Sequence, residues 1–265
     1  MDQFTEDEYA ELLDLAATKY RFVDVSDVEA VQGPVIVWRH DVDYSPQRAL
    51  ALAEVERVRG LRCVYHFMLS SRYYNALEPE IAQIVKRIAS LGHYLGIHVD
   101  MDIFGEHQEL EAEDIVAHVA FEKGILENLA GRALTSMSFH NYTVNAARLV
   151  SMECVGDLPN LSARTVFERF RYVSDSNGMW RYDRLRTVLS EDAVPRLMVL
   201  THPEWWTPDA MTPYQRLERC VSGRAAANLE SYVKLLIRDG RLAPIAERAG
   251  LPADLVERHL KSEQK

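Results

Sequence analysis

One stretch decides the fold of this chain: Val35-Ile36-Val37-Trp38-Arg39-His40-Asp41-Val42-Asp43. The apolar run of residues 35–38 predicts a buried strand, which we expect to end where the charged residues begin. Because alternate side chains of a strand share a face, Arg39, Asp41 and Asp43 tend to point the same way. Charged side chains at the carboxyl end of a buried strand lie where α/β folds place their chemistry. The alternative is a polar turn that is rich in aspartate.

Strands and helices alternate along most of the chain. After the opening strand, further strands are predicted at residues 63–69, 94–100, 135–140 and 196–202. Helices are predicted from about 5 to 20, 46 to 59, 78 to 91 and 109 to 129, and over most of the region from 212 to 264. This alternation predicts an α/β fold of mainly parallel strands with helical crossovers, either an open sheet or a (β/α) barrel.

The composition is that of a soluble globular protein. The chain has 265 residues, of which 48% are hydrophobic and 26% charged, so it can bury a full core. We predict a single domain over residues 1–265, with a core at about 34–206 and a helical C-terminal region at about 211–265. The net charge of −10 argues against a nucleic-acid backbone or an anionic membrane surface as the main partner.

Cysteine usage and the N-terminal sequence predict a cytoplasmic protein. Cys63, Cys154 and Cys220 have no metal-binding spacing, and a sparse, odd number of cysteines fits a reducing compartment. Residues 1–8 are acidic and lack the basic and apolar regions of a signal peptide. No apolar run is long enough to span a bilayer.

Four of the predicted strands end in ionisable residues. The four exits are Arg39-His40-Asp41-Val42-Asp43, His98-Val99-Asp100-Met101-Asp102, Phe139-His140-Asn141 and Thr201-His202-Pro203-Glu204. In a parallel α/β fold these exits lie on one rim, so residues far apart in sequence can meet there. Imidazole and carboxylate groups are the ligands of hydrolytic zinc-like sites, which keep one position open for water.

Other residues near these exits have a structural alternative. His66 lies in the middle of a predicted strand and His93 at the entry of another, and we expect both to be structural. The pair Trp205-Trp206 is either core packing or an aromatic surface for a sugar face or an acyl group.

The motifs on this rim resemble those of the polysaccharide deacetylase family, also called the NodB-homology or carbohydrate esterase family 4 fold. The motifs are Asp41-Val42-Asp43, Gly92-His93-Tyr94-Leu95-Gly96-Ile97-His98, Ser138-Phe139-His140 and Leu200-Thr201-His202-Pro203-Glu204-Trp205-Trp206. They follow the family's order over roughly residues 34–206 and are most similar to its divergent branch with an Arg-His-Asp-Val-Asp opening. The resemblance implies a distorted (β/α) barrel with a divalent metal, usually zinc, that removes an N- or O-acetyl group from a sugar.

The resemblance also implies roles for individual residues. These roles are Asp41 as general base, Asp43 and His98 as metal ligands, and His202 as the histidine near the acetyl group and the leaving amine. The family's second motif normally has another histidine four residues after the first, and here that position is Asp102. The third protein ligand is therefore Asp100, Asp102 or His140.

Of two further motifs of the family, one is altered in this chain. The third motif lacks its arginine, and Arg39 is expected to replace it as the partner of Asp41. Asp175 and Trp180 correspond to the acidic and aromatic pair of the fourth motif. We expect Asp175, Trp205 and Trp206 to contact the substrate.

The leading hypothesis is metal-dependent hydrolysis of the acetamide of an amino sugar. Because no export signal is visible, a sugar nucleotide or a lipid-linked glycan precursor is a better candidate partner than a finished wall polymer. One alternative is another barrel metallohydrolase, an amidohydrolase or phosphoesterase with two metals per chain. Another is a carbohydrate-binding protein on a lapsed deacetylase scaffold, which the missing second histidine favours.

Overall fold

The computed structural model describes residues 2–105, 109–142, 145–241 and 250–252. The chain divides into two compact units, Met1–Glu218 and Arg219–Lys265. The predicted core of about 34–206 lies within the first unit, and the predicted helical region of about 211–265 includes all of the second. Residues 242–249 and 253–265, for which helix is predicted, lie outside the described residues.

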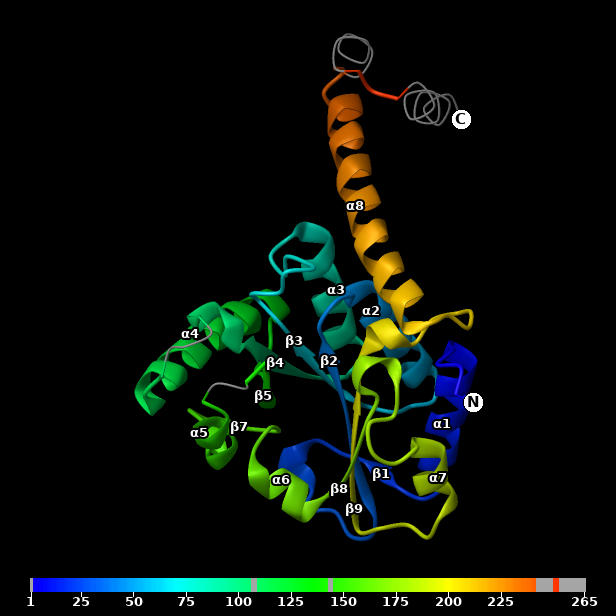
Figure 1. Ribbon diagram of the computed structural model, residues 1–265, viewed down its shortest axis with the longest axis vertical. Helices are drawn as coiled ribbons and strands as arrows, with labels where there is room; N and C mark the ends of the chain where they lie inside the picture. The colour runs from blue at the N-terminus through cyan, green and yellow to red at the C-terminus, as the bar shows by residue number, and fades with distance from the viewer. Residues whose placement is uncertain (1, 106–108, 143–144, 242–249, 253–265) are drawn as a thin grey trace. The chain divides into compact units, whose positions relative to one another are not determined.

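The first unit contains a parallel sheet with the strand order β5-β4-β3-β2-β9-β8, and β1 pairs with the start of β2. The strands are β1 (Arg21–Phe22), β2 (Val35–Val42), β3 (Val64–Phe67), β4 (Tyr94–Asp100), β5 (Ser136–His140), β8 (Arg171–Ser174) and β9 (Arg196–Thr201). The sheet curls into a half-barrel with helices around it (Figure 1). The prediction of a distorted (β/α) barrel is therefore confirmed. Among the described residues, β5 and β8 do not pair, so the barrel stays open between them.

Helices of two lengths and a small second sheet make up the rest of the described structure. The longer helices are α1 (Glu6–Ala17), α2 (Pro46–Val58), α3 (Pro79–Ser90), α4 (Ala112–Ala130) and α8 (Pro213–Arg238). The shorter ones are α5 (Ala146–Ser151), α6 (Arg164–Arg169), α7 (Leu185–Ser190), η1 (Val25–Asp27), η2 (Met101–Phe104), η3 (Ser176–Gly178) and η4 (Pro203–Trp205). A small antiparallel pair consists of β6 (Cys154–Val155) and β7 (Leu158–Pro159).

Local signals place the two helices that flank the opening strand. Thr5 caps α1, because its hydroxyl accepts the backbone N–H of Glu8. Ser45 caps α2 in the same way, and Pro46 occupies the first turn, where its missing N–H costs nothing. These caps fix where the chain leaves β2 and turns back across the sheet.

The opening strand is longer than its apolar run. β2 continues through Arg39, His40 and Asp41 to Val42, and all eight of its residues are buried. The expectation that it ends at Trp38 is wrong, because β3 and β9 pair with the charged segment on both sides. Backbone pairing on two sides outweighs the polarity of the side chains.

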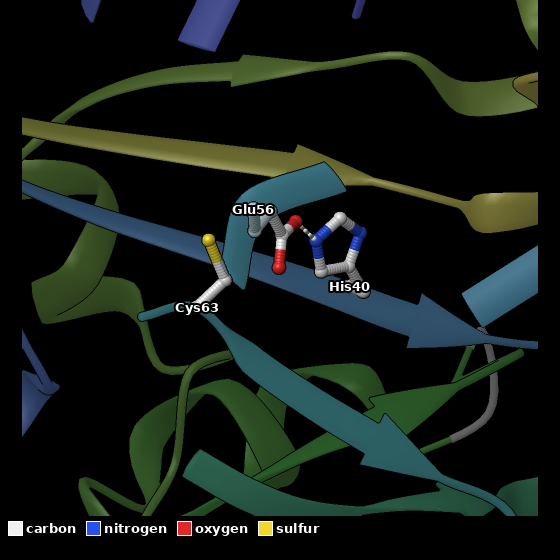
Figure 2. A group of neighbouring side chains, drawn as sticks. All are labelled: His40, Glu56 and Cys63. Carbon is white, nitrogen blue, oxygen red and sulfur yellow. Dashed lines mark hydrogen bonds and ion pairs between the residues drawn. The ribbon is translucent and has the colours of Figure 1, made fainter. Parts of the chain in front are cut away.

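A group of polar side chains is enclosed between β2, β3 and the helices α1 and α2. At its centre is the buried carboxylate of Glu56. His40 Nε2 lies 2.7 Å from its Oε1, the Tyr65 hydroxyl donates to its Oε2 at 2.7 Å, and the Tyr9 hydroxyl also donates to Oε1. Figure 2 shows three members, His40, Glu56 and Cys63. We define the closed cluster as Tyr9, His40, Glu56, Cys63, Tyr65 and His93.

The closed cluster joins the helices to the sheet. A buried carboxylate is costly unless donors surround it, so the donors from α1, β2 and β3 hold these elements together around Glu56. Burial raises the pKa of Glu56, but His40, His93 and Tyr9 offset this and lower it below its ordinary value. His93 is structural as predicted: its Nδ1 accepts the backbone N–H of Cys63 at 3.2 Å.

Candidate active site

The carboxyl ends of β2, β4, β5 and β9 surround one cavity of about 430 Å³. Its walls include Asp41 and Asp43 at the end of β2, His98 from β4, His140 from β5 and His202 after β9. The four charged strand exits therefore share one rim, as the parallel strand order predicts.

Three of the predicted metal ligands lie together: Asp43, His98 and His140. We call them the open cluster. One ligand atom of each lies within 4.8 Å of the other two. His98 Nε2 is 3.4 Å from Asp43 Oδ1, and His140 Nδ1 is 3.5 Å from Asp43 Oδ2. Asp43 Oδ1 is buried and has no hydrogen-bond partner in the described part of the chain. A buried carboxylate oxygen without a donor, beside two imidazole nitrogens, fits a divalent cation.

Ser138 orients the ligand histidine of β4. Its Oγ lies 2.7 Å from His98 Nδ1, which leaves Nε2 directed at Asp43. Burial lowers the pKa of His98 well below its ordinary value, so the ring is neutral and offers a lone pair. Burial also raises the pKa of Asp43 to about 6, although His202 and His140 lower it.

The residue four positions after the first histidine of the second motif lies outside the open cluster. This residue, Asp102, is at the start of η2, and its carboxylate lies 3.1 Å from the Arg72 guanidinium. Asp100 Oδ1 accepts the backbone N–H of Asp102 at 3.1 Å and so caps the same turn. Of the three candidates for the third ligand, His140 is the one that the structure groups with Asp43 and His98, among the residues described.

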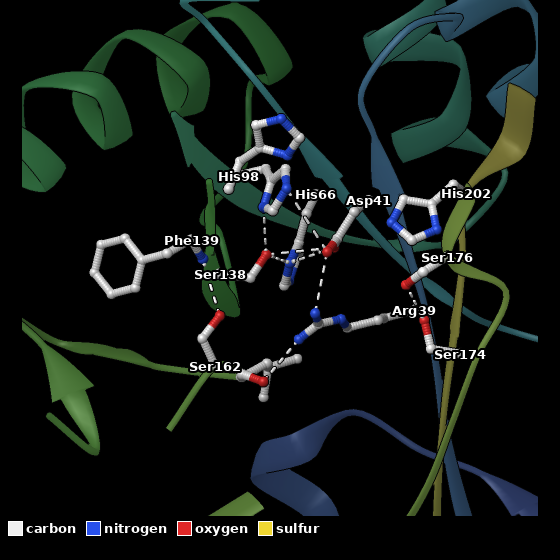
Figure 3. A network of polar contacts seen from close by, with 12 residues as sticks. Arg39, Asp41, His66, His98, Ser138, Phe139, Ser162, Ser174, Ser176 and His202 are labelled. Carbon is white, nitrogen blue, oxygen red and sulfur yellow. Dashed lines mark hydrogen bonds and ion pairs between the residues drawn. The ribbon is translucent and has the colours of Figure 1, made fainter. Parts of the chain in front are cut away.

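Asp41 is surrounded by donors (Figure 3). Arg39 Nη2 lies 3.0 Å from Asp41 Oδ2, and Arg39 Nη1 donates to the backbone oxygen of Leu161 at 2.8 Å. The Ser138 hydroxyl donates to Asp41 Oδ1 at 3.3 Å, and His66 Nδ1 lies 3.4 Å from the same oxygen. Burial raises the pKa of Asp41, but Arg39 and the neighbouring histidines hold it well below its usual range. Asp41 is therefore ionised and can accept a proton.

His66 reaches Asp41 because the next strand has a glycine beside it. On β3, His66 is paired with Asp41 of β2 and with Gly96 of β4. A Cβ at position 96 would lie 2.1 Å from the His66 ring and 2.7 Å from the Ser136 carbonyl oxygen. The ring fills that space, and its nitrogens lie 2.7 and 2.8 Å from the hydroxyls of Ser138 and Ser136. His66 is buried, as a structural residue would be, but its contact with Asp41 is missed by sequence reasoning. Serines at alternate positions of a buried strand are the signal that could reveal it.

Asp175 holds His202 in place. Its Oδ1 lies 2.7 Å from His202 Nδ1, and its two oxygens accept the backbone N–H of His202 at 3.0 and 3.1 Å. Burial lowers the pKa of His202, but the hydrogen bond and charge of Asp175 raise it to about 10. The ring is therefore protonated, and its Nε2 lies 4.0 Å from Asp43 Oδ2.

The predicted substrate-binding residues occupy two kinds of position. Trp205 lines the cavity. Trp206 is fully buried and donates from its indole N–H to Asp175 at 2.8 Å, and Asp175 is itself fully buried. Neither Trp206 nor Asp175 is among the residues that line the cavity. Their contacts position His202, which leaves Trp205 as the candidate for contact with a substrate.

Comparison with known proteins gives solved structures only. No family model matches the sequence, and no curated protein matches it either. Among the solved structures is a mutant with restored activity of a family 4 pseudoenzyme from Bacillus anthracis, with 10% identity and a TM-score of 0.44. This match covers 73% of the present chain, which spans 63% of the length of that protein.

Two further matches have the same family in their names. The family 4 domain of a xylanase from the hindgut metagenome of Trinervitermes trinervoides is 14% identical over 77% of this chain and 90% of that one, with a TM-score of 0.42. A family 4 carbohydrate esterase from Bacillus anthracis is 9% identical over 83% of this chain and 86% of that one, with a TM-score of 0.43. With identities of 14% or less and TM-scores below 0.5, these matches carry no argument, and the proposal below rests on the geometry of the site.

One general property concerns membranes. Within the described residues, no helix has the length and apolar character needed to cross a bilayer.

Proposed function

We propose that this protein is a metal-dependent hydrolase that removes an acetyl group from an amino sugar or a polysaccharide precursor, with N-deacetylation as its reaction. The observation that supports this proposal is the arrangement around one cavity. The open cluster offers three ligand atoms within 4.8 Å of one another, including one buried carboxylate oxygen without a donor. An ionised carboxylate, Asp41, and a protonated imidazole, His202, line the same cavity.

Asp43, His98 and His140 would hold the cation. A set of two imidazoles and one carboxylate is typical of catalytic zinc, so zinc is the expected ion. When bound, a divalent cation polarises a carbonyl as a Lewis acid and makes water more acidic. His140 takes the place of the second histidine of the family's second motif. The presence of Asp102 at that position therefore does not require the loss of metal binding or activity.

Asp41 acts as the general base. Its carboxylate accepts a proton from the water that attacks the acetyl carbon, as a new C–O bond forms. Arg39 and His66 hold the carboxylate in place through its two oxygens, and the Arg39 charge keeps it ionised before the attack.

His202 acts as the general acid. As the C–N bond breaks, Nε2 of the protonated ring gives its proton to the departing nitrogen, so that acetate and a free amine leave. Asp175 keeps Nδ1 occupied, which directs the acidic N–H of Nε2 toward the cavity. Each of these two proton transfers contributes roughly 10²–10⁴-fold in rate.

The test is metal analysis of the purified protein, followed by acetate release from a panel of acetylated sugars and sugar nucleotides. We expect one metal ion per chain and acetate release from at least one member of the panel. Asp41→Asn should keep the metal and lower kcat by about 10²–10⁴-fold, because the general base is removed. Full activity of this variant would rule out Asp41 as the base. Two metals per chain with phosphoester hydrolysis would favour a different barrel metallohydrolase.

A further inference from the structure

Glu204 is a buried acid in the cavity that the proposed chemistry does not use. It lies in η4 between His202 and Trp205, has no exposed surface, and is among the residues that line the cavity. Neither of its carboxylate oxygens has a hydrogen-bond partner on another of the described residues. A buried polar group without a partner is costly, so a group from outside the chain is the natural partner.

The closed cluster shows what this fold does with a carboxyl group that is only structural. Glu56 is equally buried, yet both of its oxygens receive donors from tyrosines and a histidine. In the part of the chain that the structure describes, no such donor is hydrogen-bonded to the carboxylate of Glu204. This difference indicates that the carboxyl group of Glu204 binds a ligand and does not stabilise the fold.

A metal ion is a poor candidate for that ligand. Within the described residues, two groups of three side chains have ligand atoms close enough to share a metal ion, and neither includes Glu204. The remaining donors are hydroxyl or amine groups of a molecule in the cavity. A carboxyl group can exchange hydrogen bonds with either.

The walls next to Glu204 are aromatic. Trp205 follows it directly, and the ring of Tyr44 lies 6.3 Å from that of Trp205 and 4.0 Å from that of Tyr73. All three rings line the cavity with Glu204. Flat rings pack against the C–H faces of a sugar, whereas polar groups beside them bind its hydroxyls and fix its orientation.

We propose that Glu204 is a substrate-binding residue that forms a hydrogen bond to a hydroxyl group of the sugar unit next to the open cluster. This inference rests on the proposed function, which supplies the acetylated sugar as the molecule in the cavity. With this hydrogen bond, Glu204 would favour acetylated sugars over acetyl compounds that have no sugar ring.

The test compares two acetyl donors, N-acetylated chitopentaose and p-nitrophenyl acetate, which has no sugar. Glu204→Leu removes the hydrogen-bonding group but keeps most of its volume. We expect kcat/KM for chitopentaose to fall about 10- to 100-fold, as is typical when a buried hydrogen bond to substrate is lost. The loss for p-nitrophenyl acetate should be at least tenfold smaller. Equal losses for both compounds, or no loss for either, would overturn the inference.

Glu122 provides a matched control. It is also a buried glutamate with one unpartnered oxygen, but it lies on α4 and does not line the cavity. Glu122→Leu should change kcat/KM for the two compounds by the same factor. If Glu204→Leu does not fold, Glu204→Gln takes its place, because it keeps the shape of the side chain. The Gln variant must then show the same selective loss for chitopentaose, and an equal effect on both compounds would overturn the inference.

A binding measurement separates this inference from the proposed function. If the wild-type protein releases no acetate from either compound, the proposed hydrolysis is wrong, and calorimetry with chitopentaose tests Glu204 alone. A dissociation constant about tenfold higher for Glu204→Leu than for the wild type supports the inference. Equal affinities, or no binding by the wild type, overturn it.

Discussion

The open and closed clusters both contain a carboxylate and two histidines, and they lie on opposite faces of one strand. Alternation along β2 points Asp41 toward the cavity and the adjacent His40 toward α1 and α2. In the described part of the chain, each cluster brings three ligand atoms close enough to share a metal ion. They come from Asp43, His98 and His140 in the open cluster, and from His40, Glu56 and Cys63 in the closed cluster. They differ in what the carboxylate receives: Glu56 has protein donors on both oxygens, whereas Asp43 Oδ1 has none among the described residues.

The pKa values show the same difference. Burial raises both, yet nearby imidazoles and tyrosine donors bring the pKa of Glu56 below its ordinary value. The pKa of Asp43 stays raised, at about 6. Ligand types and distances therefore do not identify a metal site by themselves. What separates the two clusters is whether the carboxylate oxygens already have protein donors. A buried carboxylate oxygen without a donor indicates a ligand site, and one with donors on both oxygens indicates a structural role.

The largest expected effect is on metal binding. Asp43→Ala should abolish metal binding and lower acetate release by roughly 10³-fold or more, since Lewis-acid stabilisation amounts to several kcal/mol. Elemental analysis and an acetate assay measure both. Glu56→Gln is the control and should retain one metal per chain. If instead the Glu56 variant loses metal while Asp43→Ala keeps it, the two clusters have been assigned the wrong way round.

The two clusters should have the opposite order of importance for stability, with the larger effect in the closed cluster. Glu56→Ala leaves His40 and two tyrosine hydroxyls buried without their acceptor, so we expect a loss of about 3–5 kcal/mol in the free energy of unfolding. Asp43→Ala removes a buried carboxyl whose imidazole neighbours lie 3.4 Å or farther from its oxygens. It should change the free energy of unfolding of the metal-free protein by less than about 1 kcal/mol, since these long contacts are weaker than the hydrogen bonds to Glu56. Urea unfolding of both variants, with a chelator present, provides the comparison. Equal losses would mean that the open cluster also supports the fold.

The smallest expected effect concerns pH. The folded-state pKa of Glu56 lies below its ordinary value, because His40, His93 and Tyr9 outweigh the effect of burial. Its contribution to stability is therefore fully present above the unfolded-state pKa and is lost as pH falls through the folded-state pKa. The free energy of unfolding of the metal-free protein should decrease below about pH 4.5, and this decrease should be smaller in Glu56→Gln. The same pH dependence in both proteins would show that other carboxylates cause it.

Strand-level features of the site could be predicted from the sequence. Alternation on the opening strand predicts that Asp41 and Asp43 point together, and the parallel order predicts that His98, His140 and His202 share their rim. The choice of third ligand could not be predicted, because it depends on how the chain turns after β4. There, Asp100 caps a tight turn, and the next carboxylate pairs with an arginine.

Other features depend on register and on short elements. His66 has the sequence context of a core residue, and only the pairing of β3 with β2 places it opposite Asp41. Strand β8 (Arg171–Ser174) is a short strand in a region without clear periodicity, yet it pairs with β9 and leads directly to Asp175. The roles of Asp175 and Trp206 follow from that placement, and neither is visible in their spacing.

The contact between Gly96 and the His66 ring also sets a rule for protein engineering. A β carbon at position 96 collides with the ring and, at 2.7 Å, with the backbone oxygen of Ser136. The position of the His66 ring therefore depends on a residue of the adjacent strand that has no side chain. Anyone who transplants the Asp41 site to another parallel sheet must transfer the glycine of the adjacent strand together with the histidine.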